Sequence, residues 1–549
     1  MPNTVLSLDS RDNVLIALRD LRHGERILFK SRTYVLQSDV PAKHKFATED
    51  LAEGSLIRMY GVVVGKAVEP VRVGELLTTR NIRHEITPFQ GRTEELRWDP
   101  PDISRWKHRD FAGYRRTDGQ VGTRNYWIVV PLVFCENRNI QVLKRALEEE
   151  LGFAAPDAYS RQVAQLAQLF REGRGEEIKT SELNSAPADP KPSRIFQNVD
   201  GIRFLGHEGG CGGTREDSNN LCGLIAGYIH HPNVAGATLL SLGCQHAQIE
   251  ILRDGLRKRN PRFDKPLVIV EQQQSGTETE MLTRAIRETF LGLVKANECE
   301  RTAVPLSKLC LGLKCGGSDG FSGLSANPAI GHTSDLLAAL GGRSILSEFP
   351  ELCGVEQDLI NRSVSSETAD RFIHLMKSYG ARAKAVGSGF EMNPSPGNIR
   401  DGLLTDAMKS AGAAKKGGRS PVTAVLDYPE YSTQPGLNLQ CTPGNDVECV
   451  TAQVGAGASV VLFTTGLGTP TGNPIAPVVK LSTNSSLSQR MPDIIDIDTG
   501  PIISGEKSIP KMGEEVLEFL IRVASGEIRT KAEEKGQEDF IPWKRGISL

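Results

Sequence analysis

The sequence predicts an α/β protein of several domains, in which a small, mostly β unit at the N-terminus is followed by α/β domains with mainly parallel sheets. Three observations lead to this prediction. The chain has 549 residues, which is too many for one ordinary hydrophobic core. Its first 88 residues contain short apolar runs separated by glycine-containing turns. Beyond about residue 110, strand patterns alternate with helix patterns, as they do in βαβ units.

The N-terminal unit, residues 1–88, is expected to consist of short strands. Its apolar runs are rich in β-branched and aromatic residues, and turns that contain glycine separate them. These runs are 26-RILFK, 33-TYVLQ and 55-SLIRMYGVVVGKAVE. Residues 89–109 are polar, contain prolines and show no hydrophobic period, so we expect a linker there.

A central α/β catalytic domain is expected at residues 110–394. The run 126-YWIVVPLVF is typical of a buried strand, and 137-NRNIQVLKRALEEELG, with Asn near its start and Gly at its end, is typical of a helix. Further strands are expected at 201-GIRFLGH, 237-ATLLSLG, 266-PLVIVE and 308-KLCLGLKC. Further helices are expected at 218-SNNLCGLIAGYIHH, 276-GTETEMLTRAIRETFLGLVKA and 367-ETADRFIHLMKSYGARA.

The C-terminal part, residues 395–549, repeats this style and is expected to form another α/β domain. Strands are predicted at 421-PVTAVLDY and 459-SVVLFTT, because both runs are apolar and β-branched. A last helix is predicted at 512-MGEEVLEFLIRVASG.

Composition and charge exclude several classes of function. Lys and Arg total 65 and Asp and Glu total 67, so no net charge favours nucleic acid or an anionic membrane as a partner. The N-terminus lacks the apolar region of a signal peptide, and the longest apolar stretches are too short to span a bilayer. We therefore expect a cytoplasmic protein that binds a small molecule. Its ten cysteines are then expected to be reduced thiols, open to metal binding.

Four cysteines stand at or just past the ends of predicted strands, namely Cys135, Cys211, Cys244 and Cys315. In open α/β sheets, ligands bind at the carboxyl ends of the strands, so these thiols could converge on one site. Thiolate, imidazole and carboxylate groups bind iron, manganese and zinc, which adds the neighbouring His207 to the candidate metal ligands. The other six cysteines are interpreted as packing residues.

Polar residues in loops are further candidates. Glu348, the first of the glutamates in 347-SEFPELCGVEQD, directly follows a predicted strand, and a glutamate in a partly apolar loop can act as a general base or a metal ligand. Asn393, Asn398 and Asn445 stand beside proline and glycine. Rigid loops that present asparagine suit polyhydroxy substrates, whose hydroxyl groups need both donors and acceptors.

Several segments resemble the altronate/galactarate dehydratase family. The resemblance covers nearly the whole chain in the same order, and its most specific motifs are KCGGSDGFSG and PGND. All four candidate cysteines fall inside matching segments. The matching segments are 113-GYRRTDGQVGTRNYWIVVPLVFC, 207-HEGGC, 242-LGC, 314-KCGGSDGFSGLSANPAIG, 346-LSEFPELCGVE, 394-PSPGN, 436-GLNLQCTPGND and 463-FTTGLGTPTGNPIAPVVKLSTNS.

The resemblance implies a fold and an activity. Residues 1–88 are similar to the β-clip (SAF) domain of these enzymes, with His44 kept. The implied activity is metal-assisted elimination of water from a sugar acid, with Fe(II) or Mn(II) as the divalent cofactor. The residues of the segment 436-GLNLQCTPGND resemble the altronate branch of the family more than the galactarate branch. The implied reaction is therefore the conversion of D-altronate to 2-dehydro-3-deoxy-D-gluconate. Thr78 and Arg80 replace two histidines of the altronate pattern.

Such an elimination needs a base for the proton beside the substrate carboxylate and an acid for the departing hydroxyl group. Our candidates for these two steps are His44 and Glu348. Arg124, in the segment GTRN, could pair with the substrate carboxylate in a bidentate manner, and Asn125 beside it is also assigned to substrate binding.

Three alternatives stay open. A galactarate dehydratase or another lyase of the family, such as a sulfolactate lyase, would apply similar chemistry to another substrate. An iron–sulfur dehydratase would hold a cluster on three of the cysteines. A non-catalytic sugar-acid-binding protein would bind hexonates without turnover, although the sequence has no basic segment for reading DNA. The sequence leaves the oligomeric state open, and a homo-oligomer is compatible with it.

Overall fold

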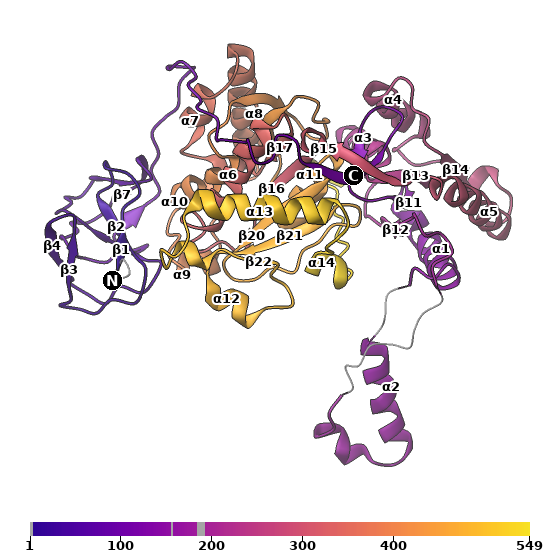
Figure 1. Cartoon of the computed structure of the whole chain (residues 1–549), viewed down its shortest axis with the longest axis horizontal. Helices are drawn as coiled ribbons and strands as arrows, with labels where there is room; N and C mark the ends of the chain where they lie inside the picture. Colours follow the sequence, from indigo (N-terminus) through magenta and orange to yellow (C-terminus); the bar gives the residue numbers. More distant parts are fainter. Residues whose placement is uncertain (1–3, 155–157, 184–192, 549) are drawn as a thin grey trace.

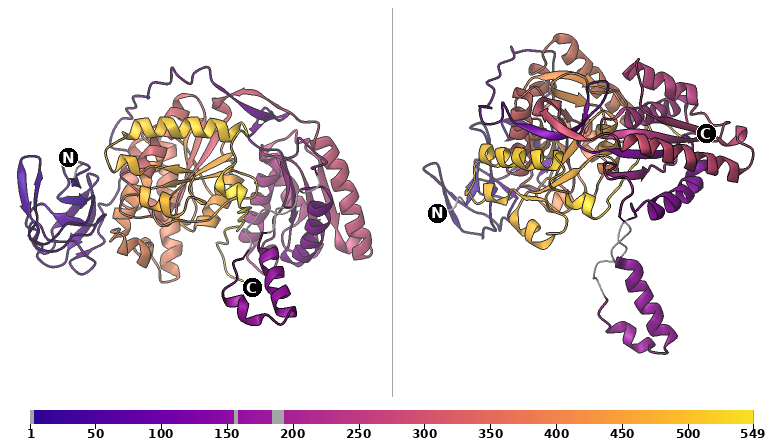
Figure 2. Two further views of the ribbon diagram at one scale, coloured as in Figure 1. Left: turned by 60° about the horizontal axis from the view of Figure 1, so that its bottom comes forward. Right: turned by 45° about the vertical axis from the view of Figure 1, so that its right-hand side comes forward.

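The computed structural model describes residues 4–154, 158–183 and 193–548. Figures 1 and 2 show three parts in a row, with the small N-terminal β unit at one end, a domain with the larger sheet in the middle and a domain with the smaller sheet at the other end. The expected fold class, a small β unit followed by α/β domains with parallel sheets, is confirmed.

Within residues 4–85, the structure describes three small antiparallel sheets, in the orders β1-β2-β5, β3-β4 and β6-β7-β8. Leu15 and Phe46, which face each other in the first sheet, are buried in the core of this unit. The strands predicted in the three apolar runs are confirmed, since β3, β4, β6 and β7 lie in them. The bounds are β1 (Val5–Leu6), β2 (Val14–Ala17), β3 (Arg26–Phe29), β4 (Arg32–Val35), β5 (Lys45–Ala47), β6 (Leu56–Met59), β7 (Val62–Ala67) and β8 (Ile82–Arg83).

Residues 89–109, predicted as a linker, contain no helix or strand. Trp106 fixes the end of this segment to the middle domain, because its indole Nε1 donates a hydrogen bond of 2.9 Å to Glu518 in α13 (Ile509–Ala524). A small antiparallel sheet follows, in which two strands from before the smaller-sheet domain are joined by one strand from after it. It is made of β9 (Asp110–Arg115), β10 (Val121–Gly122) and β15 (Arg301–Pro305).

The smaller parallel sheet has the strand order β12-β11-β13-β14. Trp127 and Val129 point to one face, which α1 and α5 cover, whereas Ile128 and Val130 point to the other face, which α3 and α4 cover. The predicted strands and helices of this domain are confirmed. Their bounds are β11 (Tyr126–Pro131), α1 (Asn137–Glu150), β12 (Gly201–Phe204), α3 (Arg215–His230), β13 (Val234–Ser241), α4 (Ile249–Arg259), β14 (Leu267–Glu271) and α5 (Glu278–Ala296), and α2 (Ala158–Arg171) lies apart from the sheet (Figure 2).

The larger sheet is parallel throughout and has the order β18-β19-β17-β16-β20-β21-β22. Its strands are β16 (Cys310–Cys315), β17 (Arg343–Leu346), β18 (Val422–Leu426), β19 (Gly436–Gln440), β20 (Val460–Thr465), β21 (Val478–Ser482) and β22 (Ile497–Asp498). The helices around it are α6 (Ala326–Ala339), α7 (Glu356–Asn361), α8 (Ser366–Ala385), α9 (Pro396–Arg400), α10 (Asp406–Ala413), α11 (Asp446–Gly455), α12 (Ser485–Arg490), α13 and α14 (Lys531–Glu534).

The domain boundary expected between residues 394 and 395 falls inside this domain. The central strands β16 and β17 come from before that point, and their hydrogen-bonded neighbours β19 and β20 come from after it. A sheet joined by hydrogen bonds across the boundary is one folding unit, so we propose a division near residue 300 instead.

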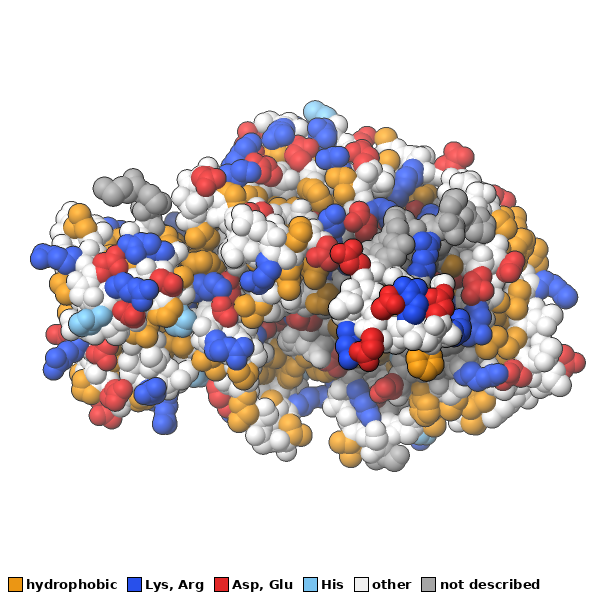
Figure 3. All heavy atoms as spheres, turned by 90° about the horizontal axis from the view of Figure 1, so that it is seen from below, with side chains coloured by type: hydrophobic (Ala, Val, Ile, Leu, Met, Phe, Trp, Pro, Cys, Tyr) orange, Lys and Arg blue, Asp and Glu red, His pale blue; other side chains and the backbone are white. Residues whose placement is uncertain are grey.

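The surface agrees with the balanced composition. On the face shown in Figure 3, Lys and Arg side chains are interspersed with Asp and Glu side chains, without an extended area of one sign. Among the helices that the structure describes, none is both long enough and apolar enough to cross a membrane.

Candidate active site

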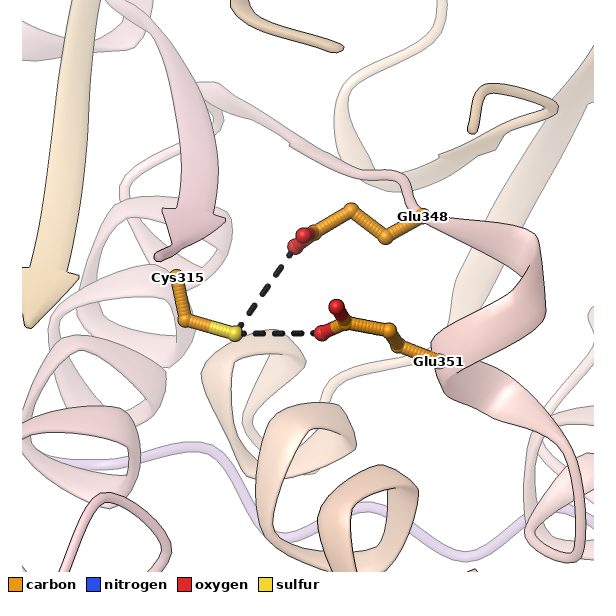
Figure 4. A group of neighbouring side chains, drawn as sticks. All are labelled: Cys315, Glu348 and Glu351. Carbon is orange, nitrogen blue, oxygen red and sulfur yellow. Dashed lines mark hydrogen bonds between the residues drawn. The ribbon is translucent and has the colours of Figure 1, made fainter. Parts of the chain in front are cut away.

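A thiol and two carboxylates meet at the carboxyl ends of two adjacent strands of the larger sheet (Figure 4). Cys315 is the last residue of β16, Glu348 follows β17, and Glu351 lies in the short 3-10 helix Phe349–Leu352. The sulfur of Cys315 lies 3.3 Å from Glu351 Oε2 and 3.9 Å from Glu348 Oε2. All three side chains are buried. We call this group the thiol–carboxylate cluster.

The backbone of Glu348 is unusual. Its φ angle is +65°, a left-handed conformation that non-glycine residues rarely adopt. Its amide donates a hydrogen bond of 3.0 Å to Thr442 Oγ1, which helps to hold this conformation. Strained residues of this kind concentrate at functional sites, so the turn after β17 is a position where the fold places a carboxylate at a cost.

Two buried lysines contact Glu348. Lys416 Nζ lies 2.6 Å from Glu348 Oε2 and 2.7 Å from Cys315 Sγ. Lys314 Nζ donates to Glu348 Oε1 and, at 3.0 Å, to the carbonyl oxygen of Gly444. Because a buried charge without a partner is costly, each lysine and Glu348 stabilise one another in this water-poor environment.

A third lysine connects the cluster with its surroundings. Lys409 Nζ lies 2.8 Å from Glu351 Oε1, and it donates a hydrogen bond of 2.6 Å to Asn393 Oδ1. The two oxygens of Glu351 therefore face different partners, Oε2 toward Cys315 and Oε1 toward Lys409.

The electrostatics of the cluster follow from burial and from these charges. Burial raises the pKa of the Cys315 thiol to about 12, and the negative charge of Glu348 adds to this effect. Burial alone would raise the pKa of Glu351, but the charges of Lys409 and Lys314 outweigh it and lower that pKa to about 2. At neutral pH the thiol is thus protonated and Glu351 is ionised.

A cavity of about 430 Å³ opens beside the cluster. Lys409, which pairs with Glu351, lines it, and so does Gly444, whose carbonyl oxygen accepts from Lys314. Gly444 leaves room at this junction, since a Cβ there would lie 3.0 Å from Asn393 Nδ2 and 3.3 Å from Glu351 Oε1. The cavity is large enough for a small organic acid. Lys409 belongs to its wall and also pairs with the ionised Glu351, so it connects the cavity with the cluster.

The three predicted asparagines all line this cavity, but they are not equally free to bind a ligand. Asn398 donates to the Ser318 carbonyl and accepts from the Ser395 amide, so both ends of its amide are used. Asn445 accepts from two backbone amides as the N-cap of α11, which leaves its NH₂ group. Asn393 accepts from Lys409, and its NH₂ group borders the cavity.

Arg124 and Asn125, predicted to bind substrate, lie elsewhere. Arg124 makes a buried, bidentate ion pair with Glu533 of α14, with distances of 2.7 and 3.0 Å. Asn125 donates to two backbone carbonyls and accepts from Arg116. Neither residue lines the cavity, so the structure does not support a substrate-binding role. Both residues instead stabilise the packing around the start of β11.

The four predicted cysteines do not form one group. Cys315 ends a strand of the larger sheet, whereas Cys135, Cys211 and Cys244 follow strands of the smaller sheet. The expected convergence assumed that all four strands belong to one sheet, whereas two sheets carry them, so a single site made of all four thiols stays a prediction. Cys222, interpreted from the sequence as a packing residue, is buried.

His207 is not available as a metal ligand in this structure. Its Nε2 lies 2.8 Å from the carbonyl oxygen of Pro131, and its Nδ1 accepts a hydrogen bond of 3.1 Å from the Gly209 amide. Burial lowers the pKa of His207 to about 4, so the ring is neutral and both of its nitrogens are used within the protein.

His44 lies where the N-terminal unit meets the middle domain. The neighbouring Lys43 forms ion pairs of 3.1 Å with Asp319 and 2.7 Å with Asp401, and Lys45 donates a hydrogen bond of 2.6 Å to the carbonyl of Gly402. His44 is half-buried and does not line the cavity. Its acid/base role stays a prediction.

The sequence analysis missed Lys409 and Lys416 and gave no role to Glu351. Lys409 and Lys416 stand seven residues apart in 408-MKSAGAAKK, a segment of small residues around α10. That spacing places two side chains on one side of a helix, and the small neighbours indicate burial. A lysine is almost never fully buried unless it is paired. Two lysines in a segment that the pattern marks as buried would therefore have indicated buried acidic partners.

The thiol–carboxylate cluster fits a divalent metal by its chemistry. Its three donor atoms lie within 4.8 Å of one another, and one thiolate with two carboxylates suits iron or manganese. Lys416 now bridges two of these donors, so a metal ion would have to displace its ammonium group. The cluster could hold a metal under that condition.

Three family descriptions match the chain in order. They are the Altronate/galactarate dehydratase SAF domain at residues 3–85, the D-galactarate dehydratase/Altronate hydrolase second domain at residues 113–297, and the D-galactarate/Altronate dehydratase C-terminal domain at residues 306–548. The last range contains the whole larger sheet, as expected if the division lies near residue 300.

Characterised relatives agree with these matches. The altronate dehydratases of Bacillus subtilis (strain 168) and of Escherichia coli (strain K12) are each 31% identical over 547 residues, which is 99% of this chain and 99% of theirs. The galactarate dehydratase (L-threo-forming) of Escherichia coli (strain K12) is 30% identical over 537 residues, or 97% of this chain and 94% of its own. Fold, site and relatives define a hydro-lyase. The chain belongs to the altronate/galactarate dehydratase family.

Proposed function

We propose that this protein is a sugar-acid dehydratase that converts D-altronate to 2-dehydro-3-deoxy-D-gluconate and water. The observation that carries the proposal is the cavity beside the thiol–carboxylate cluster, which Lys409 joins to Glu351. Two relatives that match over their full length carry the name altronate dehydratase, which supports this choice of substrate.

The reaction breaks two bonds at adjacent carbons. A base removes the proton from C2, the hydroxyl group leaves C3 with a proton as water, and the resulting enol rearranges to the 2-keto acid. Negative charge builds up on the substrate carboxylate when the C2 proton leaves. A site for this reaction must therefore hold a carboxylate, stabilise additional charge on it and accept a proton close by.

Lys409 and Glu351 can meet these needs together. Lys409 is the charged residue on the cavity wall, so its ammonium group is placed to pair with the substrate carboxylate. In the free protein, the charge of Lys409 contributes to the low pKa of Glu351. When Lys409 turns to the substrate, that pKa rises and Glu351 becomes a better base for the C2 proton.

The other residues position these groups. The NH₂ groups of Asn393 and Asn445 can donate to substrate hydroxyl groups, and Lys314 and Lys416 hold Glu348 in place. Cys315, Glu348 and Glu351 would hold a divalent ion, for which Fe(II) and Mn(II) are our candidates. Such an ion, when bound, supplies Lewis-acid stabilisation of the charge on the carboxylate.

The test is turnover by the full chain under anaerobic conditions. Metal-free protein is supplied separately with Fe(II), Mn(II), Mg(II) and Zn(II), and formation of the 2-keto acid from a panel of hexonates and hexarates is followed. We expect turnover of D-altronate with Fe(II) or Mn(II).

Glu351→Gln should lower kcat by at least about a hundredfold, the range of a lost general base. Glu176→Gln, at a carboxylate that is 93% exposed, is the matched control. Binding of hexonates without turnover in any metal would contradict the proposal and indicate a sugar-acid-binding protein.

A further inference from the structure

Three cysteines at the carboxyl edge of the smaller sheet share a property that the others lack. All ten cysteines lie in the described part of the chain, and Cys135, Cys211 and Cys244 are the ones with exposed side chains. Free cysteine is among the most buried residue types. Three exposed thiols at one edge of one sheet therefore call for a chemical explanation rather than a packing one.

The strands that lead to these thiols are direct neighbours. β12, β11 and β13 lie side by side and run parallel, and Cys211, Cys135 and Cys244 follow them in that order. The carboxyl ends of parallel strands are where open α/β sheets bind their ligands. The fold thus brings three thiols from distant parts of the sequence to one such edge.

Backbone hydrogen bonds join the three loops. In the loop after β11, the amide of Phe134 donates to the Gly209 carbonyl of the loop after β12, at 3.1 Å. In the segment after β13, the amide of Ala247 donates to the Gly210 carbonyl of the same loop, at 3.0 Å. The loop with Cys211 is therefore fixed to the two segments that carry the other exposed thiols.

Glycine makes this close approach possible. Gly210, directly before Cys211, has a φ angle of +101°, and a Cβ there would lie 2.0 Å from the carbonyl oxygen of Leu132. Gln273, which follows β14, donates a hydrogen bond of 3.3 Å from its Nε2 to Cys244 Sγ. Hydrogen bonds to sulfur are among the contacts that tune iron–sulfur centres.

We propose that Cys135, Cys211 and Cys244 bind an iron–sulfur cluster. Among the described residues, the group whose donor atoms lie close enough together for one ion is the thiol–carboxylate cluster, so these three thiols are spaced more widely. A cluster suits wider spacing, because each thiolate binds a different iron atom. Three thiolates on a four-iron cluster leave one iron without a protein sulfur, and that iron can bind an oxygen ligand.

This inference goes beyond the proposed function, which uses Cys315, Glu348 and Glu351. Its test does not depend on turnover. The full chain is purified without oxygen, incubated with Fe(II), sulfide and a reducing thiol, and desalted. We expect iron and acid-labile sulfide in equal amounts, about four of each per chain, and an electron paramagnetic resonance signal after reduction.

Single variants identify the ligands. Cys135→Ala, Cys211→Ala and Cys244→Ala should each lose most of the labile sulfide and the signal, while circular dichroism and the thermal midpoint stay close to those of the parent protein. Cys299→Ala, at a partly exposed thiol outside this edge, is the control and should keep both.

Two results would overturn the assignment. One is reconstituted protein without labile sulfide, and the other is a triple alanine variant that keeps as much iron and sulfide as the parent. Glu351→Gln separates the two proposals, because it should lose turnover and retain the iron–sulfur cluster. If Glu351→Gln retains both turnover and the iron–sulfur cluster, only the proposed function is contradicted.

Discussion

The ammonium nitrogen of Lys416 lies 2.7 Å from the sulfur of Cys315. The same nitrogen lies 2.6 Å from Glu348 Oε2, so the lysine bridges two of the three donors that would hold a metal. The charge of the cluster is thus already balanced by lysine. A divalent ion that enters has to displace this ammonium group, and it also has to take the place of the thiol proton.

We therefore expect metal affinity to rise with pH. Burial raises the pKa of Cys315 to about 12, so the thiol carries its proton throughout the neutral range and loses it when a metal binds. Each proton released increases the apparent affinity about tenfold per pH unit. Equilibrium dialysis of Mn(II) between about pH 6 and about pH 8 measures this slope. Cys315→Ala should bind more weakly and with a smaller slope, and an equal slope in both proteins would contradict the prediction.

Removal of the metal should abolish activity. A chelator is expected to stop turnover of D-altronate, and Fe(II) or Mn(II) should restore it better than Mg(II), because a thiolate ligand prefers the softer ions. The rate is measured before chelation, after it and after each addition. Full activity in excess chelator would contradict the prediction that the reaction depends on a metal.

Much of the fold could be predicted from local patterns. Continuous apolar runs such as 126-YWIVVPLVF mark β11, and the helix α13 has an apolar face that repeats at helical spacing. The strand β19 escaped prediction because 436-GLNLQ is short and contains polar residues that the sheet buries. The division that we propose near residue 300 rests on the sheet order, which joins residues that are far apart in the sequence and which no local pattern records.

The site was predictable in its parts and not in its assembly. The positions of Cys315 and Glu348 at strand ends follow from the sequence, but their contact depends on β16 lying beside β17. Arg124 shows the opposite failure. Its position before a strand suggested substrate binding, and the distant Glu533 takes up its guanidinium group instead. Pairings of this kind depend on tertiary contacts that no local pattern records.

Replacement of Arg124 tests this correction. Arg124→Leu should leave Glu533 as a buried charge without a partner and lower the stability by about 3 to 5 kcal/mol, with little change in KM. The thermal unfolding curve and the KM for D-altronate are measured together. Arg174→Leu, which removes an exposed ion pair with Glu177, is the control and should leave the melting curve nearly unchanged. A large rise in KM with an unchanged melting curve would return Arg124 to the substrate site.

The charge of the cavity wall predicts the choice of substrate. Among the described residues that line the cavity, Lys409 is the charged one. An aldonate such as D-altronate has one carboxylate, whereas galactarate has two, and a second carboxylate without a cationic partner is costly to bury. We expect kcat/KM for D-altronate to exceed that for galactarate by at least about tenfold, which corresponds to roughly 1.4 kcal/mol.

Adding a cation to the wall should reduce this preference. Ser388 lines the cavity, and Ser388→Arg would offer the second carboxylate a partner, so the ratio of the two kcat/KM values should fall. Ser10→Arg, at an exposed position in the N-terminal unit, should leave the ratio unchanged. Both substrates are compared with the same metal. If the unaltered protein prefers galactarate, the assignment to altronate is overturned, while dehydration at this site remains the reaction, because both substrates lose water across the same pair of carbons beside a carboxylate.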